Sequence, residues 1–133
     1  MTIRVVRDQQ TPMRHEIHIG RHNLAGDLSV EEGGGGTEPN PHDLYDAASG
    51  ACTALTVRWY AKRKNIPVEG LEVSVERDAS RERAGIYRLS TALTLTGDLS
   101  AAQRDELRRA AQKCPIHKLM TEVTTEIAVT LSL

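Results

Sequence analysis

Hydrophobic residues recur at helical spacing through one long stretch, residues 40–64. The residues of its expected main face recur at steps of three, four and seven, which is helical periodicity. They are Leu44, Ala48, Ala51, Cys52, Leu55 and Trp59. Asn40 is a suitable N-cap, Pro41 suits the first helical position, and Pro67 prevents much continuation. The opposite face carries mostly small, uncharged residues, namely Gly50, Thr53, Ala54, Val57 and Ala61. We therefore expect this helix to be buried on both sides.

Alternating apolar and polar residues predict strands before this helix. Two short strands are expected over residues 2–7 and 14–19, and a weaker third over residues 24–30. A run of four glycines, residues 33–36, then predicts a mobile loop leading to the helix. No Gly-Lys-Ser/Thr follows these glycines, so they do not form a phosphate-binding loop.

After the long helix, the pattern predicts a hairpin, two more helices and a last strand. The hairpin strands carry alternating apolar residues from Leu71 and from Tyr87 onward. Ser100 and Gln103 form a capping box for a helix over residues 101–112, and Pro115 begins a short helix. Alternation over residues 123–133 predicts a final strand. The order β-β-β-α-β-β-α-α-β indicates an α+β fold in a single domain, residues 1–133.

Composition narrows the possible partners. A formal net charge of −1 gives no electrostatic basis for binding nucleic acid or an anionic membrane. The sequence contains neither a signal peptide nor a run of apolar residues long enough to span a bilayer, so we expect a cytoplasmic protein. Aromatic residues make up only 3% of the chain, and Phe is absent. The resulting core is thin, which favours further burial between subunits.

The two cysteines are the residues most suited to chemistry. Cys114 precedes Pro115 at a helix start, where backbone N–H groups favour a thiolate, and Lys113 and His117 can add positive charge. Cys52 lies in the middle of its helix, so any lowering of its pKa requires a cation supplied by the fold. The simplest alternative is that both are inert, buried thiols.

A metal site is a further alternative. Cys114 and His117 lie one helical turn apart, and Cys52 and His42 could complete a tetrahedral set. The sequence lacks paired C-x-x-C elements, which makes this alternative weaker than a redox pair.

Together these motifs resemble the OsmC/Ohr family, that is, OsmC-like proteins of the osmotically inducible or organic hydroperoxide resistance type. The matching segments are the Gly-rich loop with residues 39–41, residues 47–52, residues 60–62 with 66–70, residues 97–100 and residues 113–118. The two cysteine motifs are the specific part of this resemblance, which extends from about Ile17 to the end of the chain.

The resemblance implies an intertwined homodimer with the cysteine-bearing helices at its centre. It also implies a peroxidase reaction in which Cys52 attacks a hydroperoxide and becomes a sulfenic acid, and Cys114 condenses with it to a disulfide. An external dithiol, such as a lipoyl-bearing protein, then reduces the disulfide. No metal or organic cofactor is implied.

The resemblance assigns a supporting role to an N-terminal arginine, for which Arg21 is the best match. Family peroxidases usually pair this arginine with a Glu near the start of the cysteine-bearing helix. Here that position is His42, followed by Asp43. A histidine cannot anchor a guanidinium as a carboxylate does, and Asp43 is an imperfect substitute.

The sequence therefore predicts an antioxidant, cysteine-based oxidoreductase of the oxidative stress response that reduces organic hydroperoxides. The alternative is an OsmC-fold protein that binds a small ligand or senses redox state without efficient turnover. His42 favours this alternative, and the presence of both Cys52 and Cys114 favours the enzyme.

Overall fold

The structure, a computed structural model, describes residues 1–132. It is a mixed α+β fold, as predicted, with helices and two separate antiparallel sheets. The chain forms two compact units, of which the first is Met1–Ala47 and the second begins at Ala48. The single-domain organisation stays a prediction.

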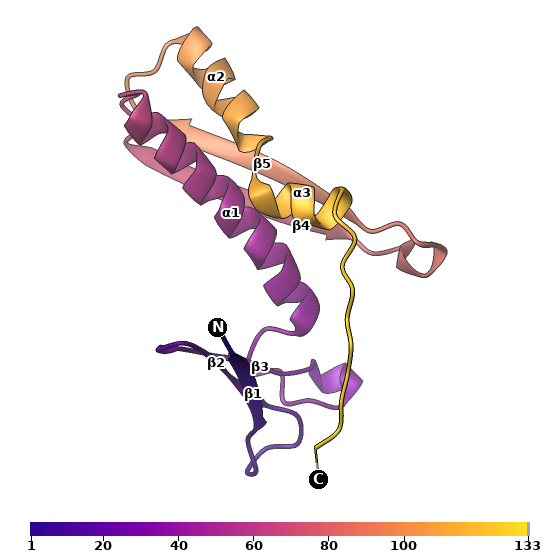
Figure 1. The fold of residues 1–133 in the computed structure, drawn as a ribbon. Coiled ribbons are helices and arrows are strands. Elements are labelled where there is room, and N and C mark those ends of the chain that lie inside the picture. The colour runs from indigo at the N-terminus through magenta and orange to yellow at the C-terminus, as the bar shows by residue number, and fades with distance from the viewer. Residues whose placement is uncertain (133) are drawn as a thin grey trace. The chain divides into compact units, whose positions relative to one another are not determined.

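The first unit contains an antiparallel sheet in the order β1-β2-β3 (Figure 1). Its strands are β1 (Ile3–Arg7), β2 (His15–Ile19) and β3 (His22–Gly26). The third strand begins and ends earlier than the predicted residues 24–30. It ends at Gly26 because the next side chain, Asp27, bonds to loop backbone and turns the chain away from the sheet.

The Gly-rich loop is held by the buried carboxylate of Asp27. This carboxylate accepts hydrogen bonds from the backbone N–H groups of Leu28, Gly35 and Thr37 and from the Thr37 hydroxyl. A Cβ at Gly34 would overlap the Leu28 carbonyl, so the loop depends on a glycine there. The predicted mobile segment therefore has a defined internal scaffold, which includes a short 3₁₀ helix at Val30–Glu32.

The long helix α1 spans Pro41–Arg63, within one residue at each end of the predicted 40–64. Its first turn is closed by reciprocal hydrogen bonds. The Asp43 N–H donates to Asn40 Oδ1 at 2.8 Å, and the Asn40 N–H donates to Asp43 Oδ2 at 3.1 Å. Within residues 1–132, no helix is both long enough and apolar enough to cross a membrane.

The predicted hairpin and the two following helices are confirmed in the second unit (Figure 1). Strand β4 (Gly70–Asp78) pairs antiparallel with β5 (Arg88–Thr96). Helix α2 (Ala101–Ala111) begins with the expected capping box at Ser100. Helix α3 (Pro115–Thr121) has Cys114 at its N-cap and Pro115 at its first position.

The faces of α1 differ from the expectation. The small-residue face forms the core, where Val57 and Ala61 are fully buried with Leu107 of α2. Gly50 lies against Val75 of β4. The expected main face is open instead, with Leu55 69% and Trp59 60% exposed. Small residues allow the helix backbone to approach the sheet closely, so the larger apolar side chains are left outside.

The predicted final strand is wrong for the described chain. Residues 123–132 form no strand, and Leu133 lies outside the described residues. Ile127, Val129 and Leu131 are each more than four-fifths exposed. Alternation specifies which side chains share a face, but a strand also requires a neighbour for its backbone N–H and C=O groups.

Candidate functional site

The two cysteines meet in the second unit. Cys52 is half-buried in α1, and Cys114 is 1% exposed at the start of α3. Both are free thiols, and each lies close enough to shift the pKa of the other. The fold therefore brings together two side chains that are remote in sequence, and their disulfide stays a prediction.

Cys52 is the more acidic thiol of the pair. Burial alone would raise the pKa of Cys52. Hydrogen bonds from the Cys114 thiol, the backbone N–H of Ile116 and the Thr56 hydroxyl outweigh burial and lower this pKa from its ordinary value. The Thr56 oxygen lies 3.9 Å from the Cys52 sulfur. These hydrogen-bond donors lie within the second unit, and the cation that the sequence called for stays a prediction.

The pKa of Cys114 is shifted in the opposite direction, upward. Burial raises the pKa of Cys114, and the hydrogen bond that its thiol donates to Cys52 raises it further. Hydrogen bonds from the backbone N–H groups of His117 and Ile116 lower the pKa of Cys114, but by less than burial and Cys52 raise it. The helix-start position that favoured Cys114 in the sequence therefore also supplies a donor to Cys52. The Cys52 thiol is therefore deprotonated more readily than an ordinary cysteine, and the Cys114 thiol less readily.

The ring of His117 connects α3 to α1. His117 Nε2 lies 2.9 Å from Ser49 Oγ and 3.1 Å from Thr53 Oγ1. Both hydroxyl-bearing residues are 1% exposed. The sequence analysis considered His117 only as a cation or a metal ligand and missed Ser49 and Thr53. Their position as small polar residues on an otherwise apolar helix face was the available signal.

A cavity of about 560 Å³ adjoins this connection in the second unit. Leu93 and Leu95 of β5 line it together with Thr53 and His117. Arg104 and Arg108 of α2 also line it, but Arg104 donates to the Leu95 carbonyl and Arg108 pairs with Asp105. The cavity offers apolar surface and guanidinium groups beside the cysteine-bearing helix.

The supporting residues proposed from the sequence lie in the first unit. Arg21 is exposed in the turn between β2 and β3. His42 is exposed in the first turn of α1, and the Asp43 carboxylate accepts the capping hydrogen bond from Asn40. The structure brings Cys52 and Cys114 together, and the roles of these three residues stay predictions.

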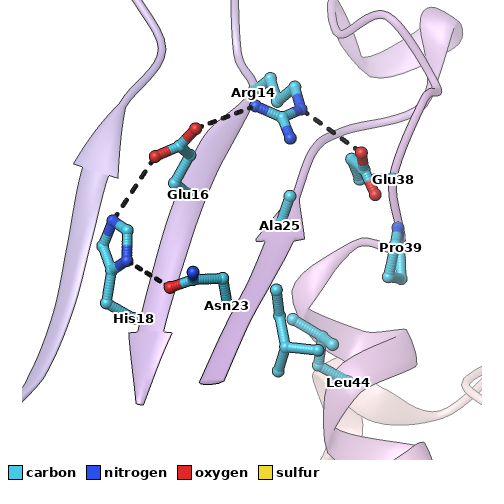
Figure 2. Close-up of a pocket in the computed structure, with 9 residues that line it drawn as sticks. Arg14, Glu16, His18, Asn23, Ala25, Glu38, Pro39 and Leu44 are labelled. Carbon is cyan, nitrogen blue, oxygen red and sulfur yellow. Dashed lines mark hydrogen bonds and ion pairs between the residues drawn. The ribbon is translucent and has the colours of Figure 1, made fainter. Parts of the chain in front are cut away.

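A second arginine of the first unit, Arg14, is fully engaged by carboxylates (Figure 2). Its guanidinium lies 3.2 Å from Asp8, 3.3 Å from Glu38 and 3.9 Å from Glu16. Burial acts to lower the pKa of Arg14, but the carboxylates of Glu38 and Asp8 raise it overall. Arg14 is therefore an internal structural cation of the first unit.

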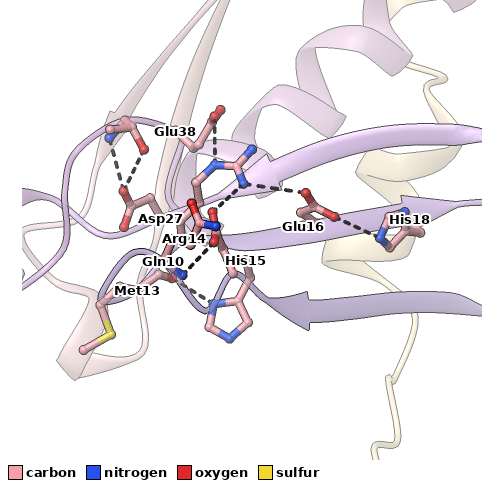
Figure 3. Close-up of polar contacts among 10 residues, drawn as sticks. Gln10, Met13, Arg14, His15, Glu16, His18, Asp27 and Glu38 are labelled. Atoms are coloured by element: carbon pink, nitrogen blue, oxygen red, sulfur yellow. Dashed lines mark hydrogen bonds and ion pairs between the residues drawn. The ribbon is translucent and has the colours of Figure 1, made fainter.

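The same network extends along the sheet of the first unit (Figure 3). Glu16 lies 3.5 Å from His18 Nε2, and His18 Nδ1 lies 2.7 Å from Asn23 Oδ1. Arg14, Glu16, His18 and Asn23 contribute to a cavity of about 450 Å³. The polar side chains that line this cavity already pair with one another, so they suit a structural role.

The residues that could have formed a metal site do not assemble one. Within residues 1–132, no group of three or more His, Cys, Asp or Glu side chains is arranged to hold an ion. The ring of His117 faces hydroxyls, and the two cysteines face each other.

Comparisons with known proteins agree with this fold. Residues 33–129 match the family model described as OsmC-like protein. An OsmC-like protein from Mycoplasma pneumoniae has a TM-score of 0.72 and 16% identity, covering 92% of this chain and 87% of that one. A comparison with functionally curated proteins found no match.

Two organic hydroperoxide resistance proteins are also similar in structure. The protein from Legionella pneumophila has a TM-score of 0.62 and 24% identity, with 92% of this chain and 90% of that one covered. The protein from Bacillus subtilis has a TM-score of 0.57 and 25% identity, with 92% of each chain covered.

Proposed function

Because this chain belongs to the OsmC-like protein family, we propose that it is a thiol-dependent peroxidase that reduces organic hydroperoxides. The observation that carries the proposal is the proximity of two free thiols, Cys52 on α1 and Cys114 at the start of α3. Cys52 has a lowered pKa and Cys114 a raised one. A thiolate beside a protonated thiol is the starting arrangement for sulfenic acid formation followed by disulfide closure.

In the first step, the Cys52 thiolate attacks the outer oxygen of the hydroperoxide. The O–O bond breaks, an S–OH group forms on Cys52, and the alkoxide takes up a proton from solvent to leave as an alcohol. The hydrogen bonds from Ile116 and Thr56 support the nucleophile by stabilising its negative charge. Such donors raise the thiolate fraction at neutral pH.

In the second step, the sulfur of Cys114 attacks the Cys52 sulfenic acid. The S–S bond forms and water leaves, with the Cys114 proton balancing the departing hydroxide. Because the two thiols already lie close together before oxidation, forming the disulfide requires only local movement. A dithiol of the lipoyl type then restores both thiols through a mixed disulfide. We propose no metal or organic cofactor, and we place the reaction in the cytoplasm, where free thiols persist.

We also propose that the chain acts as a homodimer. The exposed apolar side chains of α1, Leu55 and Trp59, support this assembly, as do the exposed alternating residues of the C-terminal segment. Soluble proteins rarely leave large apolar patches open, so a second copy that covers them would gain burial.

A steady-state assay of hydroperoxide consumption with a dithiol reductant tests the function. Wild-type protein should consume organic hydroperoxides such as cumene hydroperoxide, and Cys52→Ser should abolish turnover. Cys114→Ser should stop turnover but still allow one oxidation, leaving a sulfenic acid at Cys52 that a dimedone-type trap and mass spectrometry can detect. If Cys114→Ser leaves Cys52 unoxidised while Cys52→Ser still reacts, the proposed roles are reversed.

The second candidate is a redox sensor or ligand-binding protein with this fold. It is favoured by His42, which replaces the Glu usual in family peroxidases. A sensor would form the disulfide once per hydroperoxide but would show no sustained consumption with excess dithiol. The same assay therefore separates the two functions.

A further inference from the structure

The helix that supplies a donor to Cys52 is short and needs to be held in place. Helix α3 contains seven residues, Pro115–Thr121. Isolated helices of this length are not stable in water, so contacts with other elements determine its position. The backbone N–H of Ile116 acts on the Cys52 sulfur, and the N–H of His117 acts on Cys114. Any shift in this first turn would change both thiols.

The ring of His117 provides such a contact. Its Nε2 reaches two buried hydroxyls on α1, one turn of helix apart, at Ser49 and Thr53. These residues flank Cys52, one turn before it and immediately after it in the chain. The contact thus joins the two backbone segments that carry the cysteines.

The hydrogen-bond pattern also fixes the state of the ring. The Thr53 hydroxyl donates its only proton to the Ser49 carbonyl at 2.9 Å. In this pattern Thr53 Oγ1 accepts from His117, so we infer that Nε2 carries a hydrogen, which it shares between Thr53 Oγ1 and Ser49 Oγ. A side chain with an N–H at this position can reproduce the contact, whereas an apolar side chain of similar size cannot.

We propose that His117 is a positioning residue that docks the first turn of α3 on Ser49 and Thr53, keeping the Ile116 N–H on the Cys52 sulfur and the two thiols in contact. This inference deepens the proposed function, on which its catalytic meaning rests. The docking itself can be measured without peroxide, through the reactivity of the Cys52 thiolate.

The experiment compares three full-length variants by alkylation with iodoacetamide across pH, with mass spectrometry reporting modification at Cys52. His117→Leu should move the midpoint of Cys52 alkylation to higher pH and slow it about three- to tenfold at pH 7, the effect of weakening about one hydrogen bond to a charged group. His117→Gln, whose amide N–H replaces Nε2–H, should restore most of the wild-type rate.

Thr121→Ala is the matched control. It removes the hydrogen bond from the Thr121 hydroxyl to the His117 carbonyl at 2.7 Å but leaves the ring contact intact. It should alkylate as the wild type does. If Thr121→Ala slows alkylation as much as His117→Leu, or His117→Gln gives no rescue, α3 is responding to general destabilisation and the positioning role is wrong. A folded His117→Leu protein with wild-type alkylation would also refute it.

If His117→Leu does not fold, the double variant Ser49→Ala/Thr53→Val takes its place and should show the same upward shift in the alkylation midpoint. The ring can also be examined directly, because ¹⁵N NMR should show His117 Nε2 protonated. A neutral ring protonated only on Nδ1 would contradict the docking geometry. A wild-type protein with the expected alkylation pattern but no hydroperoxide consumption would refute the peroxidase and leave this inference standing.

Discussion

The pKa of Cys52 is lowered in a position where the dipole of its own helix gives little help. It lies in the middle of α1, where the helix dipole is weak, yet hydrogen bonds from Cys114, Ile116 and Thr56 reach its sulfur. The sequence identified both cysteines but could not identify these donors. Backbone N–H groups have no signature in the sequence, and contact between α1 and α3 is a product of folding.

Thr56 offers the simplest residue-level test. Thr56→Val keeps the shape of the side chain but removes the hydroxyl near the Cys52 sulfur. The pKa of Cys52 should rise, and alkylation of Cys52 at pH 7 should slow by about two- to fivefold, as expected for one weak hydrogen bond. Thr94→Val on β5, an exposed position, is the control. Equal effects from the two variants would exclude a specific contribution from Thr56.

The lowered pKa also predicts the pH dependence of oxidation. Only the thiolate attacks the hydroperoxide, so the rate constant should rise as pH increases through the pKa of Cys52 and then level off. That midpoint should lie below the midpoint of an unfolded cysteine. Stopped-flow oxidation across pH measures it, with urea-unfolded protein as the reference. A midpoint at or above the reference value would contradict the hydrogen-bond arrangement.

For Arg21, the family resemblance makes a separate prediction at this scale. Arg21→Ala should raise the pKa of Cys52 and slow the first oxidation, because an arginine stays charged and stabilises a thiolate. Arg4→Ala, which removes an exposed arginine from β1, is the matched control. Unchanged alkylation and oxidation in Arg21→Ala would mean that the donors of the second unit are sufficient.

Among the elements, α1 is predicted well in extent and poorly in orientation. Its bounds follow from Asn40, Pro41 and the apolar spacing, which are local signals. Which face meets the core depends on the close approach of the hairpin, and periodicity cannot distinguish two apolar faces. The small face fits because Gly50 allows Val75 of β4 to lie against the helix backbone.

Packing at Gly50 can be tested by substitution. A Cβ added there would lie 3.0 Å from Val75 Cγ2, so Gly50→Val should overpack the contact and lower the free energy of unfolding by about 1–3 kcal/mol. Val75→Ala in the same chain should recover part of this loss, which a double-mutant cycle by chemical denaturation would reveal. Strictly additive effects would show that the two positions do not touch.

The loop before α1 gives a pH-linked prediction. Burial acts to raise the pKa of Asp27, but hydrogen bonds from Leu28, Thr37 and Gly35 lower it overall. Because the folded pKa is lowered, its contribution to stability is present above the unfolded pKa and is lost as pH falls through the folded pKa. Asp27→Asn should therefore reduce the melting temperature at pH 7, with the difference from wild type shrinking in acid. A constant difference across pH would contradict this account.

For the whole molecule, the sequence predicted the α+β class and most elements, but not the fate of the C-terminal segment. A strand over residues 123–133 was predicted from alternation, and the described residues 123–132 lack a neighbouring strand. Alternation is a property of one segment, whereas pairing requires another segment. Similarly, the sequence could not reveal that Leu55 and Trp59 would be exposed.

The proposed homodimer is a property of the whole molecule, and it is supported by the exposed apolar side chains Leu55 and Trp59. Sedimentation should show a dimer at micromolar concentration, and Trp59→Asp should shift it toward monomer because a buried charge at the interface is costly. Arg58→Asp, next to it on α1 and also exposed, is a control for added negative charge. A wild-type protein that stays monomeric at that concentration would refute the homodimer.

The most direct test of the central claim is a single-turnover measurement. Fully reduced protein is mixed with one equivalent of an organic hydroperoxide, without dithiol, and the alcohol product and the cysteine state are quantified together. The account predicts one alcohol formed and one Cys52–Cys114 disulfide gained per hydroperoxide consumed. Alcohol formation without this disulfide, or a disulfide between other pairs of thiols, would contradict the two-cysteine cycle. No alcohol and no loss of free thiol would contradict the peroxidase itself.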